Sequence, residues 1–133
     1  VKHRCPKDVK MYFRESNQDF ILQTDAVRVE QVLTNFLTNA AKFTTKGEIV
    51  LSYDIDESQQ QVIFSVTDTG IGVPEDKAEV IFERFEKLDS FVQGTGLGLH
   101  ICRLIAKLLQ GKVMVDTSYT QGARFIFIHP IKQ

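Results

Sequence analysis

Apolar and polar residues alternate along several stretches of the chain, with the period of two that is typical of β-strands. Each of these stretches is followed by polar residues, glycine or proline, which end the alternation. Neighbouring stretches are close enough along the chain to form hairpins. The pattern predicts six strands in three consecutive pairs: 9–14 with 20–22, 49–56 with 62–67, and 113–116 with 125–128.

A longer stretch, 26–43, carries apolar residues at the three- and four-residue spacing of an amphipathic helix. Thr24 and Asp25, which directly precede it, are residue types that favour a helix N-cap. Lys46 and Gly47 provide the turn that follows the helix. Its predicted buried face consists of Val29, Val32, Leu33, Phe36, Leu37 and Ala40.

A second long helix is predicted through Leu109, with Gly111 as the glycine that closes it. Pro74 can occupy the first turn of a short helix between the two long ones. This order of elements predicts an α+β fold in which helices cover one face of a mixed sheet. In the second helix we expect His100, Arg103, Lys107 and Gln110 to be exposed, and Ile101, Cys102, Leu104, Ile105, Leu108 and Leu109 to be buried.

A polar stripe runs beside the buried face of the first helix. At roughly 100° per residue, its members fall within about a quarter of the helix circumference. Asparagine is a poor helix former, so two asparagines four residues apart suggest selection for contacts. Their carbonyl oxygens suit a Mg²⁺ ion that also holds phosphate, and a lysine suits the phosphates. The alternative is a helix whose polar side simply faces water. The stripe consists of Arg28, Gln31, Asn35, Asn39 and Lys42.

Asp68 ends the strand at 62–67 and has the parity of its inward-facing residues. A buried carboxylate needs a hydrogen-bond donor, either from the protein or from a ligand. Gly70 and Gly72 follow at once and permit a sharp turn and the close approach of another molecule. The stretch therefore predicts the floor of a ligand pocket, although an aspartate that only caps its own loop is the simpler alternative.

A second glycine cluster, 94–99, leads into the second long helix. Glycine-rich backbone at a helix N-terminus presents free N–H groups to phosphate. The GxGxG spacing and the preceding loop exclude a dinucleotide-binding fingerprint, and a P-loop is excluded because no Gly-Lys-Ser/Thr follows. Upstream of it, Phe82 and Phe85 are three residues apart, and on pattern alone we expect them to pack in the core.

Composition and charge narrow the function. The chain has 133 residues, a net charge of -1 and 43% hydrophobic residues, which suits one globular domain and gives no charge-driven reason for nucleic-acid or membrane binding. Its two cysteines, Cys5 and Cys102, lack metal-site spacing and fit a reducing compartment. We find neither a signal peptide nor a membrane-spanning apolar run, so a soluble chain is expected.

Four sequence boxes resemble, in order, those of the catalytic and ATP-binding domain of sensor histidine kinases. The superfamily is shared with type II topoisomerases, mismatch-repair ATPases and the ninety-kilodalton chaperones. The resemblance covers nearly the whole chain and implies one domain, 1–133, with the two-layer α/β sandwich called the Bergerat fold, in which a mostly antiparallel sheet is covered on one face by helices. The boxes are the N box at 25–44, the first glycine box at 68–72, the F box at 82–85 and the second glycine box at 94–99.

The resemblance also implies roles for individual residues toward ATP and Mg²⁺. Asp68 would accept a hydrogen bond from the adenine amino group, and Gly70 and Gly72 would shape that side of the pocket. Asn39, with Asn35 beside it, would bind Mg²⁺, and Lys42 would reach the phosphates. Phe82 and Phe85 would anchor the start of a lid, and Arg84 would lie near phosphate or the acceptor domain. The lid would close over the phosphates together with the second glycine box, which consists of Gly94, Thr95, Gly96, Leu97, Gly98 and Leu99.

The amide of Asn35 distinguishes kinases from hydrolases within the superfamily, because hydrolysing relatives carry a glutamate general base at the matching position. An amide cannot serve as a general base, so a kinase is favoured over an ATPase. The implied partners are a dimerisation and histidine phosphotransfer domain of the same parent protein, which this chain lacks, and a downstream response regulator. The domain itself would be cytoplasmic, whether or not its parent is membrane-anchored. A hydrolysing relative and a nucleotide-binding regulatory module without transfer activity are the alternatives.

Overall fold

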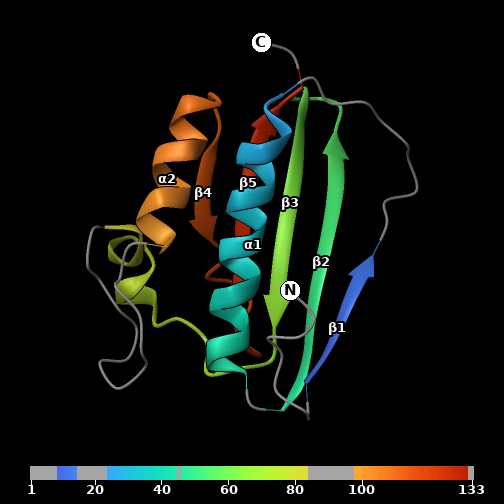
Figure 1. The fold of residues 1–133 in the computed structure, drawn as a ribbon. Coiled ribbons are helices and arrows are strands. Elements are labelled where there is room, and N and C mark those ends of the chain that lie inside the picture. Colours follow the sequence, from blue (N-terminus) through green and yellow to red (C-terminus); the bar gives the residue numbers. More distant parts are fainter. Residues whose placement is uncertain (1–8, 15–23, 45, 84–97, 132–133) are drawn as a thin grey trace.

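One five-stranded sheet forms the framework of the protein in this computed structural model, which describes residues 9–14, 24–44, 46–83 and 98–131. The strand order is β1-β2-β3-β5-β4 (Figure 1). β1 runs parallel to β2, and all other neighbours are antiparallel. The bounds are β1 Val9–Arg14, β2 Gly47–Asp56, β3 Gln61–Asp68, β4 Lys112–Val115 and β5 Arg124–Pro130.

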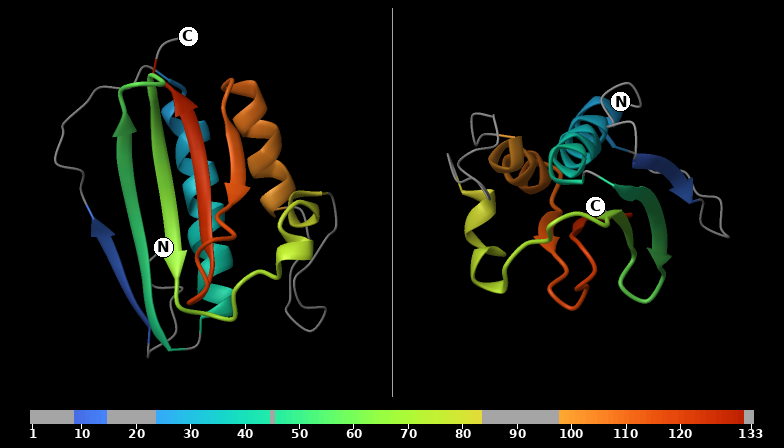
Figure 2. Two further views of the ribbon diagram at one scale, coloured as in Figure 1. Left: turned by 180° about the vertical axis from the view of Figure 1, so that it is seen from behind. Right: turned by 90° about the horizontal axis from the view of Figure 1, so that it is seen from below.

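Two α-helices cover one face of this sheet, and both views of Figure 2 show them on the same side. α1 spans Ala26–Phe43 and α2 spans Gly98–Leu108. The Asp25 side chain caps α1 by accepting a hydrogen bond from the Arg28 N–H at 3.3 Å. The predicted two-layer α+β fold is therefore confirmed, and the first helix begins and ends where the sequence predicts.

The core lies between the two helices and the central strands. Phe36 of α1 packs on Phe125 of β5, with 5.4 Å between the ring centroids. Phe64 stacks on its cross-strand partner Phe127 at 5.8 Å. His129 extends the same inward-facing row of β5 and is fully buried. This row fixes the face of the sheet onto which the helices pack.

The prediction of which α2 residues are buried is partly wrong. Leu104 and Leu108 are 51% and 66% exposed, whereas Cys102, Ile105, Ala106 and Leu109 are buried. At about 100° per residue, those four buried residues form one stripe, and Leu104 and Leu108 lie more than about 100° away from its centre. The helix packs on the core through this stripe and through the partly buried Leu99 and Ile101, whereas the side that carries Leu104 and Leu108 is exposed.

The end of α2 and the segment before it also differ from expectation. Gln110, not glycine, adopts the left-handed conformation after the helix, with φ of 65°. Gly111 is required for space, because a Cβ there would overlap the Ile128 carbonyl oxygen. The predicted short helix consists of two 3₁₀ turns, η2 Glu75–Lys77 and η3 Val80–Phe82, and Pro74 precedes the first of them.

The predicted strand at 20–22 lies outside the described residues. Within the part of the chain that is described, no helix has the length and apolarity needed to cross a membrane.

Candidate functional site

Asp68 lies at the end of β3, beside the end of α1 and the start of β5 (Figure 1). It is only 2% exposed, as its parity in the strand predicts. Its Oδ1 accepts hydrogen bonds from the Gly70 N–H at 2.9 Å and the Ala123 N–H at 3.1 Å. Both structural donors bind the same oxygen. Among the described residues no donor reaches Oδ2, which leaves that oxygen for a ligand.

Burial decides the electrostatics of this carboxyl group. Removal from water raises the pKa of Asp68, and the backbone N–H groups of Gly70 and Ala123 oppose the rise. The carboxylate therefore accepts fewer hydrogen bonds in the folded protein than it would accept in water. An additional donor from a ligand would stabilise the carboxylate, and the site is suited to a group such as an exocyclic amine.

Gly70 and Gly72 bring the loop after β3 into close contact with its neighbours. A Cβ on Gly70 would lie 2.9 Å from both the Phe43 carbonyl carbon and Thr44 Oγ1, and nearer still to the Phe43 carbonyl oxygen. Gly72 has φ of 78°, and a Cβ there would lie 2.9 Å from the Gly122 carbonyl oxygen. Gly70 is therefore needed where the loop packs on the end of α1, and Gly72 where it packs on the loop between β4 and β5.

The polar stripe of α1 divides into two parts. Arg28 lies near the start of the helix, 3.9 Å from the N-cap carboxylate of Asp25, and is remote from Asp68. Asn39 and Lys42 lie in the last turns, at the end where β3 also terminates (Figure 1). Neither ion pair among the described residues involves Lys42, which is exposed. Only the second half of the stripe belongs to the site.

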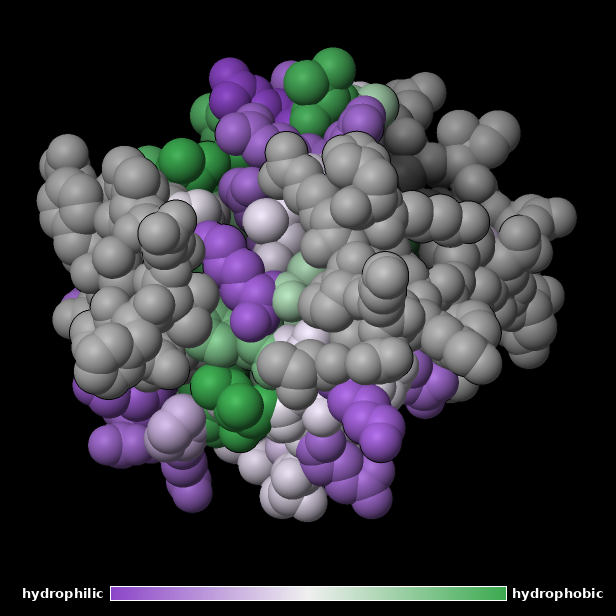
Figure 3. All heavy atoms as spheres, turned by 60° about the horizontal axis from the view of Figure 1, so that its bottom comes forward, coloured by the Kyte–Doolittle hydropathy of each residue, from purple (hydrophilic) through white to green (hydrophobic). Residues whose placement is uncertain are grey.

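Two buried polar atoms at this end have no hydrogen-bond partner among the described residues. They are Asn39 Nδ2 and Thr44 Oγ1. An unsatisfied buried polar group costs about 1–3 kcal/mol, so such atoms commonly mark a place that a ligand or water completes. Figure 3 turns this end toward the viewer and shows hydrophilic residues beside apolar ones. The orphaned Asn39 Nδ2 is a donor suited to a phosphate oxygen, whereas a metal ion would need the amide oxygen of the same side chain.

Asn35 has a second role that sequence reasoning did not predict. Its Nδ2 donates to the Gly98 carbonyl oxygen at 3.3 Å and so connects α1 to the first residue of α2. The bond uses the amide nitrogen and leaves the amide oxygen as an acceptor. Asn35 is therefore still able to act as a metal ligand. No group of three His, Cys, Asp or Glu side chains suited to a metal occurs in the described ranges, so amide and phosphate oxygens would have to supply the ligands.

Phe82 is a core residue, as its spacing predicts. It is buried and meets Phe125 edge-on, with 6.4 Å between centroids. Its carbonyl oxygen lies 3.3 Å from His100 Nδ1, which must carry the proton because a carbonyl can only accept. Gly98 and Leu99 begin α2. The other predicted lid and phosphate residues, Arg84, Phe85, Gly94, Thr95, Gly96 and Leu97, lie outside the described residues.

The loop between β4 and β5 also contributes to the site, although no pattern in the sequence predicts it. Its Ala123 N–H binds the Asp68 carboxylate, and the Tyr119 hydroxyl donates to the Asp68 carbonyl oxygen at 3.3 Å. No periodicity marks these residues, because they approach Asp68 only through the pairing of β3 with β5, more than 50 residues apart.

Comparison with known proteins decides the family. A profile described as "Histidine kinase-, DNA gyrase B-, and HSP90-like ATPase" matches residues 24–133. The chain belongs to this ATPase family. Its similarity to histidine kinases in particular, expected from the four boxes, is confirmed by relatives and solved structures alike.

Among curated relatives, the chain is 36% identical over 123 residues to the autoinducer 2 sensor kinase/phosphatase LuxQ of Vibrio vulnificus, a match that covers 86% of the chain and 14% of LuxQ. It is 37% identical over 112 residues to the adaptive-response sensory kinase SasA of Synechococcus elongatus, covering 83% of the chain and 29% of SasA. The chain thus spans less than a third of the length of these two relatives.

Solved structures agree with the fold. Full-length ShkA in complex with AMPPNP superposes with a TM-score of 0.83 at 34% identity, covering 94% of this chain and 26% of ShkA. The catalytic domain of the histidine kinase ThkA, in a nucleotide-free form, gives 0.81 at 32% identity and covers 95% and 82% of the two chains.

Proposed function

We propose that this chain is the ATP-binding catalytic domain of a two-component sensor histidine kinase. It would transfer the γ-phosphate of Mg-ATP to a histidine on an adjacent dimerisation domain, which then passes it to a response regulator. The observation that carries the proposal is the buried Asp68, whose Oδ1 is fixed by two backbone N–H groups while Oδ2 accepts nothing from the described residues. That arrangement suits recognition of the adenine amino group.

Phosphate and metal binding would fall to the last turns of α1. Asn39 and Asn35 offer amide oxygens, which are ligands that Mg²⁺ accepts together with phosphate and water. Lys42 is exposed in the last turn and is free to neutralise phosphate charge. The bound nucleotide supplies the phosphoryl group, and these residues only position it and stabilise its charge.

The nature of Asn35 distinguishes a kinase from a hydrolase. Its side chain is an amide whose nitrogen already donates to Gly98, and an amide cannot deprotonate water. The acceptor imidazole needs no such base, because its neutral ring nitrogen is itself a nucleophile. Transfer to histidine is therefore favoured over transfer to water. A regulatory module that binds nucleotide without transfer would also use Asn39 and Lys42 to hold Mg-ATP, so only the transfer reaction itself distinguishes such a module from a kinase.

Transfer of radiolabelled γ-phosphate tests the proposal. The chain would be mixed with Mg²⁺, labelled ATP and the separately produced dimerisation domain of its parent, using a variant with the acceptor histidine changed to glutamine as control. We expect an acid-labile, base-stable label on the wild-type acceptor only, and little phosphate release when no acceptor is present. Rapid release without acceptor would identify a hydrolase, and binding without either reaction would identify a regulatory module.

A further inference from the structure

The loop between β4 and β5, residues 116–123, folds against the backbone of Asp68. The Asp68 N–H donates to the Ala123 carbonyl oxygen at 2.8 Å, and the Ala123 N–H returns a bond to Asp68 Oδ1 at 3.1 Å. The Tyr119 hydroxyl donates to the Asp68 carbonyl oxygen at 3.3 Å. Gly122 permits the approach, since a Cβ there would overlap that same carbonyl oxygen. The loop thus bonds the N–H, the carbonyl and one carboxylate oxygen of Asp68.

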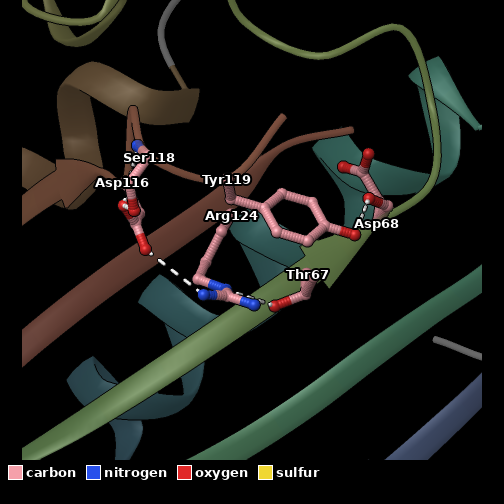
Figure 4. A network of polar contacts seen from close by, with 6 residues as sticks. All are labelled: Thr67, Asp68, Asp116, Ser118, Tyr119 and Arg124. Atoms are coloured by element: carbon pink, nitrogen blue, oxygen red, sulfur yellow. Dashed lines mark hydrogen bonds and ion pairs between the residues drawn. The ribbon is translucent and has the colours of Figure 1, made fainter. Parts of the chain in front are cut away.

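Arg124 holds this loop in place. Its guanidinium lies 4.5 Å from the ring centroid of Tyr119, in cation–π geometry. Its Nε donates to Thr67 Oγ1 at 3.1 Å, and Nη1 is 3.2 Å from Asp116 Oδ2. Asp116 also accepts from the Ser118 N–H at 3.0 Å. Figure 4 shows the guanidinium lying between Asp116 and Thr67, with Tyr119 reaching from there to Asp68.

This network lies behind the site rather than in it. Arg124 precedes Phe125, which faces the helices, and so it projects from the opposite face of the sheet. The side chains of Arg124 and Asp116 are 37% and 24% exposed, and ion pairs so accessible to water add little to global stability. Tyr119 connects this network of five polar residues directly to Asp68, so the network calls for a local explanation.

We propose that Tyr119 and Arg124 are positioning residues for adenine recognition. They fix the β4–β5 loop, the loop fixes the Ala123 N–H and the Asp68 backbone, and the carboxylate is thereby held with Oδ2 directed to the ligand. This inference rests on the proposed function, in which Asp68 receives the adenine amino group. Neither side chain contacts the nucleotide in this account.

The test compares two ligands that differ only in the group that Asp68 would recognise. Titration calorimetry with Mg²⁺ measures the affinity for ATP and for purine riboside triphosphate, which lacks the amino group. The variants are Tyr119→Phe, which removes one hydroxyl, and Arg124→Gln, which removes the charge over the ring. Tyr53→Phe on β2 is the matched control, with the same chemical change away from the loop. Urea denaturation of each variant monitors folding.

We expect the wild type and Tyr53→Phe to prefer ATP by about 10- to 100-fold, the range for one hydrogen bond to a charged group. Tyr119→Phe and Arg124→Gln should reduce that preference by about 3- to 10-fold, with little change in the affinity for purine riboside triphosphate. Equal losses for both ligands would show a structural role and overturn the inference, as would an unchanged preference. A wild type without any preference would instead refute the proposed role of Asp68.

Discussion

Replacement of Gly70 by alanine tests how tightly the loop after β3 is packed on the end of α1. The added methyl would overlap the Phe43 carbonyl oxygen and would lie 2.9 Å from the Phe43 carbonyl carbon and from Thr44 Oγ1. Carbon atoms pack optimally at about 3.5–4.0 Å, so the loop and the helix end must separate by roughly 0.6–1 Å. Backbone atoms cannot yield as a side chain can, and overpacking of this kind costs about 1–3 kcal/mol.

The same shift lengthens the hydrogen bond from Gly70 N–H to Asp68 Oδ1, now 2.9 Å. Bonds to charged groups contribute about 1.5–3 kcal/mol, so the loss of part of this one adds to the destabilisation. We expect a total loss of roughly 2 kcal/mol or more in the free energy of unfolding. For a slope near 2 kcal/mol per molar urea, that loss lowers the denaturation midpoint by about 1 M. Affinity for ATP should fall as well, because Asp68 loses a positioning bond.

Gly98→Ala is the matched control for stability. Gly98 is the first residue of α2, and no described atom lies within 4 Å of a Cβ placed there. Alanine is the better helix former, by up to about 1 kcal/mol, so this variant should be as stable as the wild type or more so. If Gly70→Ala kept both the wild-type urea midpoint and the wild-type affinity, the close approach inferred for this loop would be wrong.

Three further predictions concern other parts of the molecule. Because burial raises the pKa of Asp68 above its ordinary 3.8, its stabilising contribution is complete below that pH and declines as pH rises through the folded value. In urea unfolding without nucleotide, Asp68→Asn should therefore gain stability relative to wild type as pH rises above about 4, and a relative loss would contradict the assignment. Ile105→Ala should cost about 2–5 kcal/mol and Leu108→Ala under about 1, and similar losses in urea unfolding would refute the orientation of α2. Burial raises the pKa of Cys102 to about 12, so in a Cys5→Ser background a thiol reagent near pH 8 should label it only after denaturation, and rapid labelling of the folded protein would argue against its burial.

Local signals predict the first helix and the burial of Asp68 correctly. Asp25 is an N-cap, and the apolar spacing that follows it defines α1 over Ala26–Phe43. Asp68 continues the alternation of Val62 and Val66, both fully buried, so its burial follows from parity alone. Such predictions succeed because each depends on residues within one element.

Features that depend on contacts between elements could not be predicted in this way. Leu104 and Leu108 are apolar, but their exposure depends on which neighbours cover α2. Similarly, Gly111 follows that helix, but it must be glycine because a side chain there would overlap the Ile128 carbonyl oxygen of β5. Gln110, one residue earlier, adopts the left-handed conformation. The contact of Tyr119 with Asp68 arises from the pairing of β3 with β5, which no local pattern encodes.

The role of Asp68 is tested most directly by calorimetric titration of this chain with a non-hydrolysable ATP analogue in the presence of Mg²⁺. Asp68→Asn would be compared with wild type and with Asp54→Asn, the same substitution at an exposed position on β2. The account predicts that wild type and Asp54→Asn bind equally well, and that Asp68→Asn loses at least about tenfold in affinity, as expected when a charged acceptor is replaced. Equal binding by all three proteins would contradict it.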